Sequence, residues 1–194
     1  GPHADLLAAC AAVLAGGATV LQYRDDGDDH ARRLQEASVL AQLCAAHGAP
    51  LLIADDIALA AESGATGVHL GLDGNRVAEA RHRLGPDAII GVSCGNRLER
   101  AREMTAAGAD YLSFGAFFPS PTLPHAALAD IALLREAQSL RLPIVAIGGI
   151  NADNGYPLIA AGAHSLAAIS ALFDSANPTA AARSLSRLFS GAPA

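Results

Sequence analysis

The sequence predicts an α/β fold, a (β/α)₈ barrel of the TIM type from which the first strand is absent. Short apolar runs rich in β-branched residues recur along the chain, most of them after Gly or Gly-Ala. Stretches of Ala, Leu, Arg and Glu with helical spacing separate these runs. This regular alternation, with no linker between units, predicts a parallel sheet with right-handed crossovers.

Seven apolar runs are the expected strands. Each has four to six residues, a length typical of strands that are buried on both faces. A preceding Gly suits the end of a helix because it adopts the left-handed conformation without strain. In chain order the strands are expected within residues 16–24, 48–56, 64–71, 87–94, 108–115, 142–149 and 162–170.

The segments between these runs are the expected helices. Residues 29–46 place Leu34, Ala37, Ala41 and Cys44 on one face, and Asn177 followed by Pro178 is typical of a helix start. The expected helices include residues 4–15, 29–46, 97–107, 127–140, 153–161 and 178–189.

The number of strands leaves a gap in the predicted barrel. About eight helices accompany seven strands, so a closed barrel needs one more strand before Gly1. A doubly wound open sheet is the alternative, but the GxGxxG turn expected after its first strand is missing from the sequence. We expect one barrel domain over residues 1–194.

Composition narrows the function classes. The chain is 52% hydrophobic, carries a net charge of −6 and has no basic run, so nucleic acid is not an expected partner. No apolar run reaches the roughly 18 residues of a membrane span, and no signal peptide is recognised, which predicts a cytoplasmic protein without a membrane partner. Cys10, Cys44 and Cys94 are scattered, which indicates buried core residues rather than disulfides or a zinc site.

The chain is lysine-free, since all 13 basic residues are arginine. It therefore has no lysine to form a Schiff base, act as a general base or hold a phosphate. GC-rich coding and deliberate engineering are the two explanations that the sequence leaves open.

Polar residues gather where the predicted strands end. In barrels of this type the active site lies at the C-terminal ends of the strands. The opposite ends carry mostly Gly, Ala and Pro, an asymmetry expected of an enzyme or its descendant. The polar residues are Gln22, Arg24, Asp55, Asp56, His69, Asp73, Ser93, Ser120, Thr122 and Ser170, with Gly148 and Gly149 beside them.

Two of these strand ends predict a phosphate site. In AIGGIN (146–151) the glycines Gly148 and Gly149 allow a close backbone approach, and their N–H groups suit an anion. In AAIS (167–170) the hydroxyl of Ser170 follows the next strand. Loops after the last two strands of a barrel commonly bind phosphate. A tight turn with helix packing is the alternative interpretation.

Charged residues at two earlier strand ends suggest an anion site and a metal site. Arg24 suits a phosphate or diphosphate, and a structural salt bridge to Asp25, Asp26 or Asp55 is the alternative interpretation. Asp55 is a candidate Mg²⁺ ligand, unless it or Asp56 caps the following helix. His69 is expected to be packed and satisfied.

Taken together, seven segments resemble the thiamine-phosphate synthase family: LQYR (21–24), ADD (54–56), GVHLG (67–71), IIGVSC (89–94), GADYLSFGAFFPSPT (108–122), PIVAIGGI (143–150) and AAISAL (167–172). The resemblance implies a (β/α)₈ barrel with a strand ahead of residue 1. It also implies a transferase of thiamine biosynthesis that joins hydroxymethylpyrimidine diphosphate to a thiazole phosphate. In that reaction diphosphate leaves with the help of Mg²⁺, and the thiazole nitrogen captures a pyrimidine carbocation.

The resemblance assigns roles to matching positions. Arg24 and Ser93 are the expected catalytic residues. Asp55 matches the first Mg²⁺ ligand, and Asp73 lies one place from the second, which falls at Gly74. The expected partners are small phosphorylated heterocycles, with a homodimer as the oligomeric state considered. The substrate-binding positions are Gln22, Arg24, Ser120, Thr122, Gly148, Gly149, Ile169 and Ser170.

Departures from the family pattern all concern the diphosphate and its metal. Asp26 and Leu123 stand where lysines are expected, Ala54 stands for an asparagine, and Gly74 stands for an aspartate. One charge-stabilising donor is worth roughly 3–4 kcal/mol in a transition state, so impaired or altered activity is expected.

Three hypotheses follow. The first is a synthase with a rearranged site, in which arginines such as Arg76 replace the lysines. The second is a non-catalytic relative, natural or engineered, that binds a phosphorylated metabolite. The third is an enzyme repurposed for another phosphorylated heterocycle. The related thiazole tautomerases match less well, because their catalytic histidine is expected near Ala116.

Overall fold

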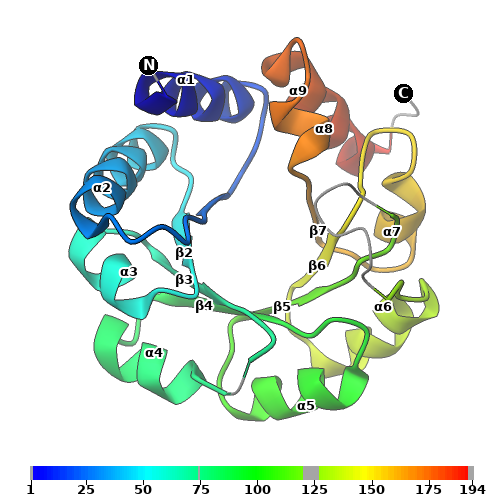
Figure 1. Cartoon of the computed structure of the whole chain (residues 1–194). Coiled ribbons are helices and arrows are strands. Elements are labelled where there is room, and N and C mark those ends of the chain that lie inside the picture. Colours follow the sequence, from blue (N-terminus) through cyan, green and yellow to red (C-terminus); the bar gives the residue numbers. More distant parts are fainter. Residues whose placement is uncertain (1, 74, 120–126, 192–194) are drawn as a thin grey trace.

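A seven-stranded parallel sheet forms the centre of the computed structural model, which describes residues 2–73, 75–119 and 127–191. Each strand pairs with the next one in the chain, and the sheet curls so that helices surround it (Figure 1). This sequential order rules out a doubly wound sheet, in which the strand order reverses. The strands are β1 (Leu21–Tyr23), β2 (Leu51–Ala54), β3 (Gly67–Leu70), β4 (Ile89–Ser93), β5 (Tyr111–Phe114), β6 (Ile144–Ile147) and β7 (Ser165–Ala167).

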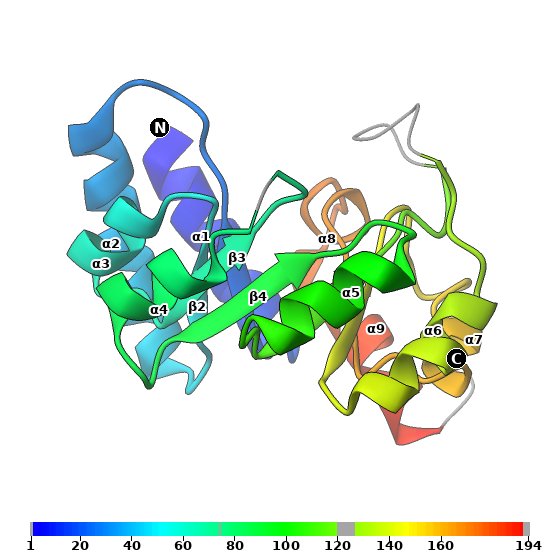
Figure 2. The same ribbon diagram turned by 90° about the horizontal axis from the view of Figure 1, so that it is seen from below.

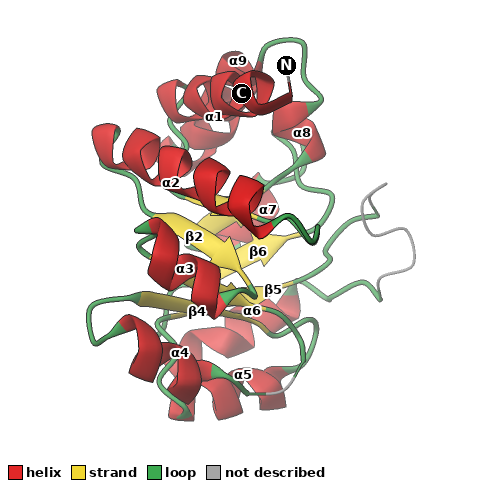
Figure 3. Cartoon of the chain, turned by 60° about the vertical axis from the view of Figure 1, so that its left-hand side comes forward, coloured by secondary structure: helices red, strands yellow, loops and turns green. Residues whose placement is uncertain are grey.

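The helices lie on the outside of the curled sheet (Figures 2 and 3). Short 3₁₀ turns follow two of them, at Gln138–Leu140 and Leu188–Ser190. The helices are α1 (Pro2–Ala15), α2 (His30–Ala46), α3 (Ile57–Ser63), α4 (Val77–Leu84), α5 (Leu98–Ala106), α6 (Ala132–Ala137), α7 (Tyr156–Ala160), α8 (Ser170–Phe173) and α9 (Pro178–Arg187).

Three sequence-based boundaries were wrong. The helix expected over 153–161 begins only at Tyr156. The helix expected over 127–140 begins at Ala132, where the carboxylate of Asp130 accepts a hydrogen bond from the Ala132 N–H at 2.8 Å. Ser170 does not end a strand but begins α8. The predicted start of α9 is confirmed, because the Asn177 side chain accepts from the Ala180 N–H at 3.0 Å and Pro178 follows it.

The sheet has a gap between its two edge strands, β1 and β7, where an eighth strand would close the barrel. In the part of the chain that the structure describes, each of these strands pairs on one side only, as the missing first strand predicted. Beside this gap α1 packs against α9 (Figure 1). The Thr179 hydroxyl donates to the Ala12 carbonyl at 2.9 Å, and the Ser186 hydroxyl donates to the Gly17 carbonyl at 3.0 Å. These bonds hold the two ends of the chain together.

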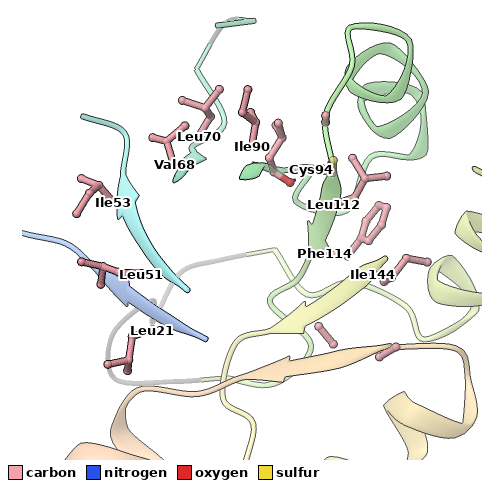
Figure 4. Close-up of a cluster of buried hydrophobic side chains, with 14 of the residues drawn as sticks. Leu21, Leu51, Ile53, Val68, Leu70, Ile90, Cys94, Leu112, Phe114 and Ile144 are labelled. Carbon is pink, nitrogen blue, oxygen red and sulfur yellow. Dashed lines mark hydrogen bonds between the residues drawn. The ribbon is translucent and has the colours of Figure 1, made fainter. Parts of the chain in front are cut away.

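Apolar side chains fill the space within the sheet and between sheet and helices. Leu51, Ile53, Ile90 and Phe114 are almost fully buried (Figure 4). Strands buried on both faces explain why the apolar runs are continuous rather than alternating. The three cysteines are also buried and unbridged, which confirms the expected structural role.

Among the described residues, no helix combines the length and the apolar character that crossing a bilayer requires.

Candidate active site

The sequence-predicted site residues lie at the C-terminal ends of the strands or in the loops that follow. Parallel strands paired in sequence order bring these ends to one edge of the sheet. Ser120 and Thr122 lie outside the described residues. In strand order the others are Gln22 in β1, Arg24 after β1, Asp55 after β2, Asp73 after β3, Ser93 at the end of β4, Gly148 and Gly149 after β6, and Ile169 and Ser170 after β7.

Asp55 directs its carboxylate across the strand ends. Its backbone is left-handed, with φ of 60°, a conformation that short polar residues tolerate best among non-glycines. One carboxylate oxygen accepts from the Gly71 N–H at 2.6 Å, and the other accepts from Arg24 at 3.3 Å. Asp56, not Asp55, caps α3, through a bond from the Leu59 N–H at 2.9 Å. The Asp55 carboxylate therefore stays at the site.

The guanidinium of Arg24 is paired with two carboxylates. Its Nε donates to Asp26 at 3.2 Å and its Nη1 donates to Asp55 at 3.3 Å. The salt-bridge alternative from the sequence is thus realised in the structure. Both contacts are well exposed, and exposed ion pairs are worth only about 0–1 kcal/mol. An incoming anion can therefore displace either carboxylate at low cost.

A polar cleft of about 490 Å³ opens beside this pair. Its described lining carries more carboxylates than arginines: Asp25, Asp26, Asp28, Asp55, Asp56 and Glu79 against Arg33, Arg76 and Arg83. Arg76 donates to the Asp55 carbonyl at 3.0 Å and pairs with Glu79 through two bonds of 2.8 and 3.0 Å. Arg76, which was considered as a replacement for a lysine, therefore lies beside Asp55. Its guanidinium is also paired with the Glu79 carboxylate.

A buried polar cluster lies under the strand ends. His69 Nδ1 is 2.7 Å from the Tyr111 hydroxyl, and His69 Nε2 is 2.9 Å from the Ser93 hydroxyl. The expectation that His69 is packed and satisfied is confirmed. Sequence analysis missed Tyr111 and Ser113, whose hydroxyl lies 3.5 Å from that of Ser93. The sequence contained a signal for both residues, namely a polar group inside an otherwise apolar strand. Such a group requires a hydrogen-bond partner when it is buried.

Burial lowers the pKa of His69 to about 4, with the charge of Asp55 opposing this shift and that of Arg24 adding to it. Below pH 6.5 the unfolded chain binds a proton that the folded chain takes up only near pH 4. The folded state therefore has its full unfolding free energy above pH 6.5, where His69 is neutral in both states. As the pH falls below 6.5, protonation of His69 in the unfolded chain lowers that free energy. We expect about 3 kcal/mol of unfolding free energy to be lost on this account between pH 7 and pH 4.

Urea unfolding of the wild type and of His69→Gln across this range measures the effect. The difference between the two proteins isolates the effect of His69, because the two chains carry the same carboxylates and the same other histidines. Parallel pH curves would contradict the expectation.

Arg100 fastens two of the loops that carry the site. From α5 its Nε donates to the Ser93 carbonyl at 2.9 Å and its Nη2 donates to the Gly71 carbonyl at 3.0 Å. The residue is 8% exposed. These bonds join the end of β4 to the start of the loop after β3, the loop that contains Asp73.

Arg100→Met is expected to lower the unfolding free energy by about 2–3 kcal/mol, because two carbonyls lose charged donors in a buried place. Arg102→Met, on the same helix, is the matched control. Arg102 makes one exposed contact with Glu99 at 3.4 Å, so a loss below about 0.5 kcal/mol is expected. Equal losses in urea unfolding would show that Arg100 has no special part in holding the loops.

The backbone conformation and close packing of the turn after β6 require glycine at two positions. Gly148 and Gly149 have φ of 93° and 65°. A Cβ at Gly149 would lie 2.7 Å from the Phe118 carbonyl oxygen and 2.6 Å from that of Pro119. Asn154 donates to the Gly149 carbonyl at 3.0 Å and accepts from the Asn151 N–H at 2.9 Å. The sequence-based analysis missed both asparagines, which hold the turn in place.

The second predicted phosphate loop follows the neighbouring strand. β7 pairs with β6, so Ile169 and Ser170 come from the strand next to the glycine turn. Ile169 is 63% exposed and Ser170 begins α8. The two loops in which a phosphate site was predicted thus follow adjacent strands, and Ile169 is exposed in the second of them.

The sequence model of the family described as thiamine monophosphate synthase matches residues 1–172. The thiamine-phosphate synthase of Thiobacillus denitrificans is 53% identical over 189 residues, 97% of this chain and 90% of the relative. That of Chromobacterium violaceum is 52% identical over 186 residues, 96% of this chain and 90% of the relative.

Solved structures of known proteins share the fold of this chain. A thiamine phosphate pyrophosphorylase from Pyrococcus furiosus superposes with a TM-score of 0.87 at 31% identity, covering 95% of this chain and 89% of that one. A 3-hexulose-6-phosphate synthase superposes with a TM-score of 0.71 at 20% identity, covering 96% of this chain and 94% of that one, and shares the fold alone.

Proposed function

Because the chain belongs to the thiamine monophosphate synthase family, we propose that it joins a pyrimidine diphosphate to a thiazole phosphate at a reduced rate, with the thiazole-phosphate half of its site retained and the diphosphate half altered. The observation that carries this proposal is the contrast between the two halves. The turn after β6 has two consecutive glycines with positive φ, which suits a backbone anion site, whereas Arg24 after β1 is engaged by two carboxylates.

The thiazole-phosphate half is supported by the loops after β6 and β7. Gly148 and Gly149 carry no side chain, and on the side where a Cβ would stand they pack against the loop after β5. Their backbone N–H groups are the proposed donors to the phosphate. Ser170, the first residue of α8 after β7, is proposed to add a hydroxyl. Ile169, exposed beside it, supplies an apolar surface for a heterocycle. No charged side chain is needed for this half, so the absence of lysine leaves it intact.

The diphosphate half is supported by Arg24 and Ser93 and opposed by Asp26. A diphosphate that binds Arg24 must displace Asp26 from its guanidinium, and the carboxylate then stays nearby as an unfavourable charge. The surplus of carboxylates in the described lining acts in the same direction. We therefore expect weak binding of the pyrimidine diphosphate and a slow release of its leaving group.

Mg²⁺ fits this site as an ion that arrives with the diphosphate. Among the described residues, no three His, Cys, Asp or Glu side chains are grouped to hold a metal. Mg²⁺ commonly takes one or two carboxylates and completes its shell with substrate phosphates and water. Asp55, whose carboxylate lies at the strand ends, is the proposed first ligand, and Asp73 in the loop after β3 is the proposed second. When bound, the ion would neutralise charge that develops on the leaving diphosphate.

Calorimetric titration tests the two halves separately. The chain is titrated with the thiazole phosphate alone, then with the pyrimidine diphosphate and Mg²⁺, and product is measured with both substrates. Saturable thiazole-phosphate binding, weak diphosphate binding and slow product formation are expected. The Thiobacillus denitrificans relative is the control for substrates and assay.

Three results would overturn the proposal. No thiazole-phosphate binding would remove the retained half. Diphosphate binding and turnover equal to those of the relative would show that the altered residues do not matter. Thiazole-phosphate binding with no product would favour a non-catalytic phosphate-binding barrel.

A further inference from the structure

Tyr111, His69 and Ser93 form a line of hydrogen bonds across three neighbouring strands, β5, β3 and β4. The Tyr111 hydroxyl is 2.7 Å from His69 Nδ1, and the opposite ring nitrogen is 2.9 Å from the Ser93 hydroxyl. His69 is 8% exposed. The line begins under the strand ends and finishes at Ser93, the last residue of β4.

Gly91 makes this line geometrically feasible. In the sheet register Gly91 stands between His69 on β3 and Tyr111 on β5. A Cβ at Gly91 would overlap the ring of Tyr111. Without that atom the ring crosses β4 and stacks on the imidazole, with centroids 5.5 Å apart. The arrangement therefore depends on three residues of three strands.

Two orders of the hydrogens fit the two distances, and only one of them gives the Tyr111 proton an acceptor among the described partners. Burial raises the pKa of Tyr111, so its hydroxyl keeps its proton and needs an acceptor. A neutral imidazole has one acceptor nitrogen and one N–H donor. If Tyr111 donates to Nδ1, then Nε2 carries the hydrogen and donates to the Ser93 oxygen. The Ser113 hydroxyl, 3.5 Å from the Ser93 oxygen, approaches as a second donor.

We infer that Tyr111 and His69 are positioning residues that set the direction of the Ser93 hydroxyl. With its oxygen accepting from His69, Ser93 directs its own proton to a ligand oxygen at the strand ends. Ser93 is thereby a committed donor rather than a hydroxyl free to rotate. That the ligand oxygen belongs to the pyrimidine diphosphate rests on the proposed function, whereas the order of the hydrogen bonds does not.

Nitrogen-15 NMR of the histidine side chains tests the order directly, because the two neutral tautomers have different ring shifts and long-range couplings. The chain has seven histidines, and His69→Gln assigns the signal. At neutral pH we expect His69 in the Nε2–H form. In Tyr111→Phe the ring loses its proton donor, so a mixture or a change to the Nδ1–H form is expected.

Tyr23→Phe is the matched control. Tyr23 also loses a hydroxyl bond, the one it donates to Glu36 at 2.6 Å, but this bond lies away from His69. The tautomer of His69 should be unchanged in this variant. An Nδ1–H form or an imidazolium in the wild type would overturn the inference, as would a Tyr111→Phe spectrum identical to that of the wild type.

Binding measurements on Tyr111→Phe distinguish a failure of this inference from a failure of the proposed function. Tyr111→Phe should lower the affinity for the pyrimidine diphosphate with Mg²⁺ by about tenfold and leave the affinity for the thiazole phosphate unchanged. Its effect should largely vanish in a Ser93→Ala background, where the hydroxyl is gone. An additive loss would contradict the inference. If the wild type binds no pyrimidine diphosphate, the proposed function fails, and the tautomer still decides the order of the hydrogen bonds.

Discussion

Asp26→Lys is expected to raise the affinity for the pyrimidine diphosphate by at least about 30-fold. The change removes the carboxylate that lies 3.2 Å from Arg24 Nε and adds a cation to the lining of the same cleft. In water a unit charge at 4 Å contributes about 1 kcal/mol, and two unit charges change here, so about 2 kcal/mol is a lower estimate. Product formation should rise with affinity, since the same charges act on the leaving diphosphate.

Titration and turnover at one salt concentration measure this gain, and Asp28→Lys is the control. Asp28 lines the same cleft, so its replacement makes the same change of net charge, whereas the carboxylates that Arg24 contacts are those of Asp26 and Asp55. A gain below tenfold is expected for Asp28→Lys. Equal gains in both variants would show that the general field of the cleft matters rather than the pairing of Arg24 with Asp26.

Gly149→Ala is expected to weaken thiazole-phosphate binding by at least about 100-fold. A Cβ there would lie 2.7 Å from the Phe118 carbonyl oxygen and 2.6 Å from that of Pro119, so the turn must move away from the loop after β5. That movement displaces the N–H groups proposed to hold the phosphate. Loss of two or more backbone hydrogen bonds to an anion accounts for an effect of this size.

Gly48→Ala separates this geometric effect from general strain. Gly48 has φ of 66°, almost the same as the 65° of Gly149, but no atom lies within 4 Å of the position its Cβ would take. Both variants therefore carry a similar backbone strain of about 1–2 kcal/mol, visible in thermal unfolding. Only Gly149→Ala should lose binding. Affinity within twofold of the wild type in Gly149→Ala would contradict the proposed phosphate site.

The sequence by itself determined the architecture and where its functional edge lies. Continuous apolar runs of strand length alternate with helical stretches, which specifies a parallel sheet. Parallel strands all end at one edge, so the positions of Arg24, Asp55, Ser93 and Gly149 followed from the order of the segments. Even the gap between β1 and β7 could be predicted, because strands can be counted in the sequence.

The tertiary structure alone decided which partners these side chains have. Asp56 rather than Asp55 caps α3, and Arg24 pairs with both Asp26 and Asp55. Tyr111 reaches His69, 42 residues away, because the register places Gly91 between them. Periodicity and turn chemistry act over a few residues and can be recognised locally. Contacts between strands depend on register and side-chain packing, which arise only when distant segments assemble.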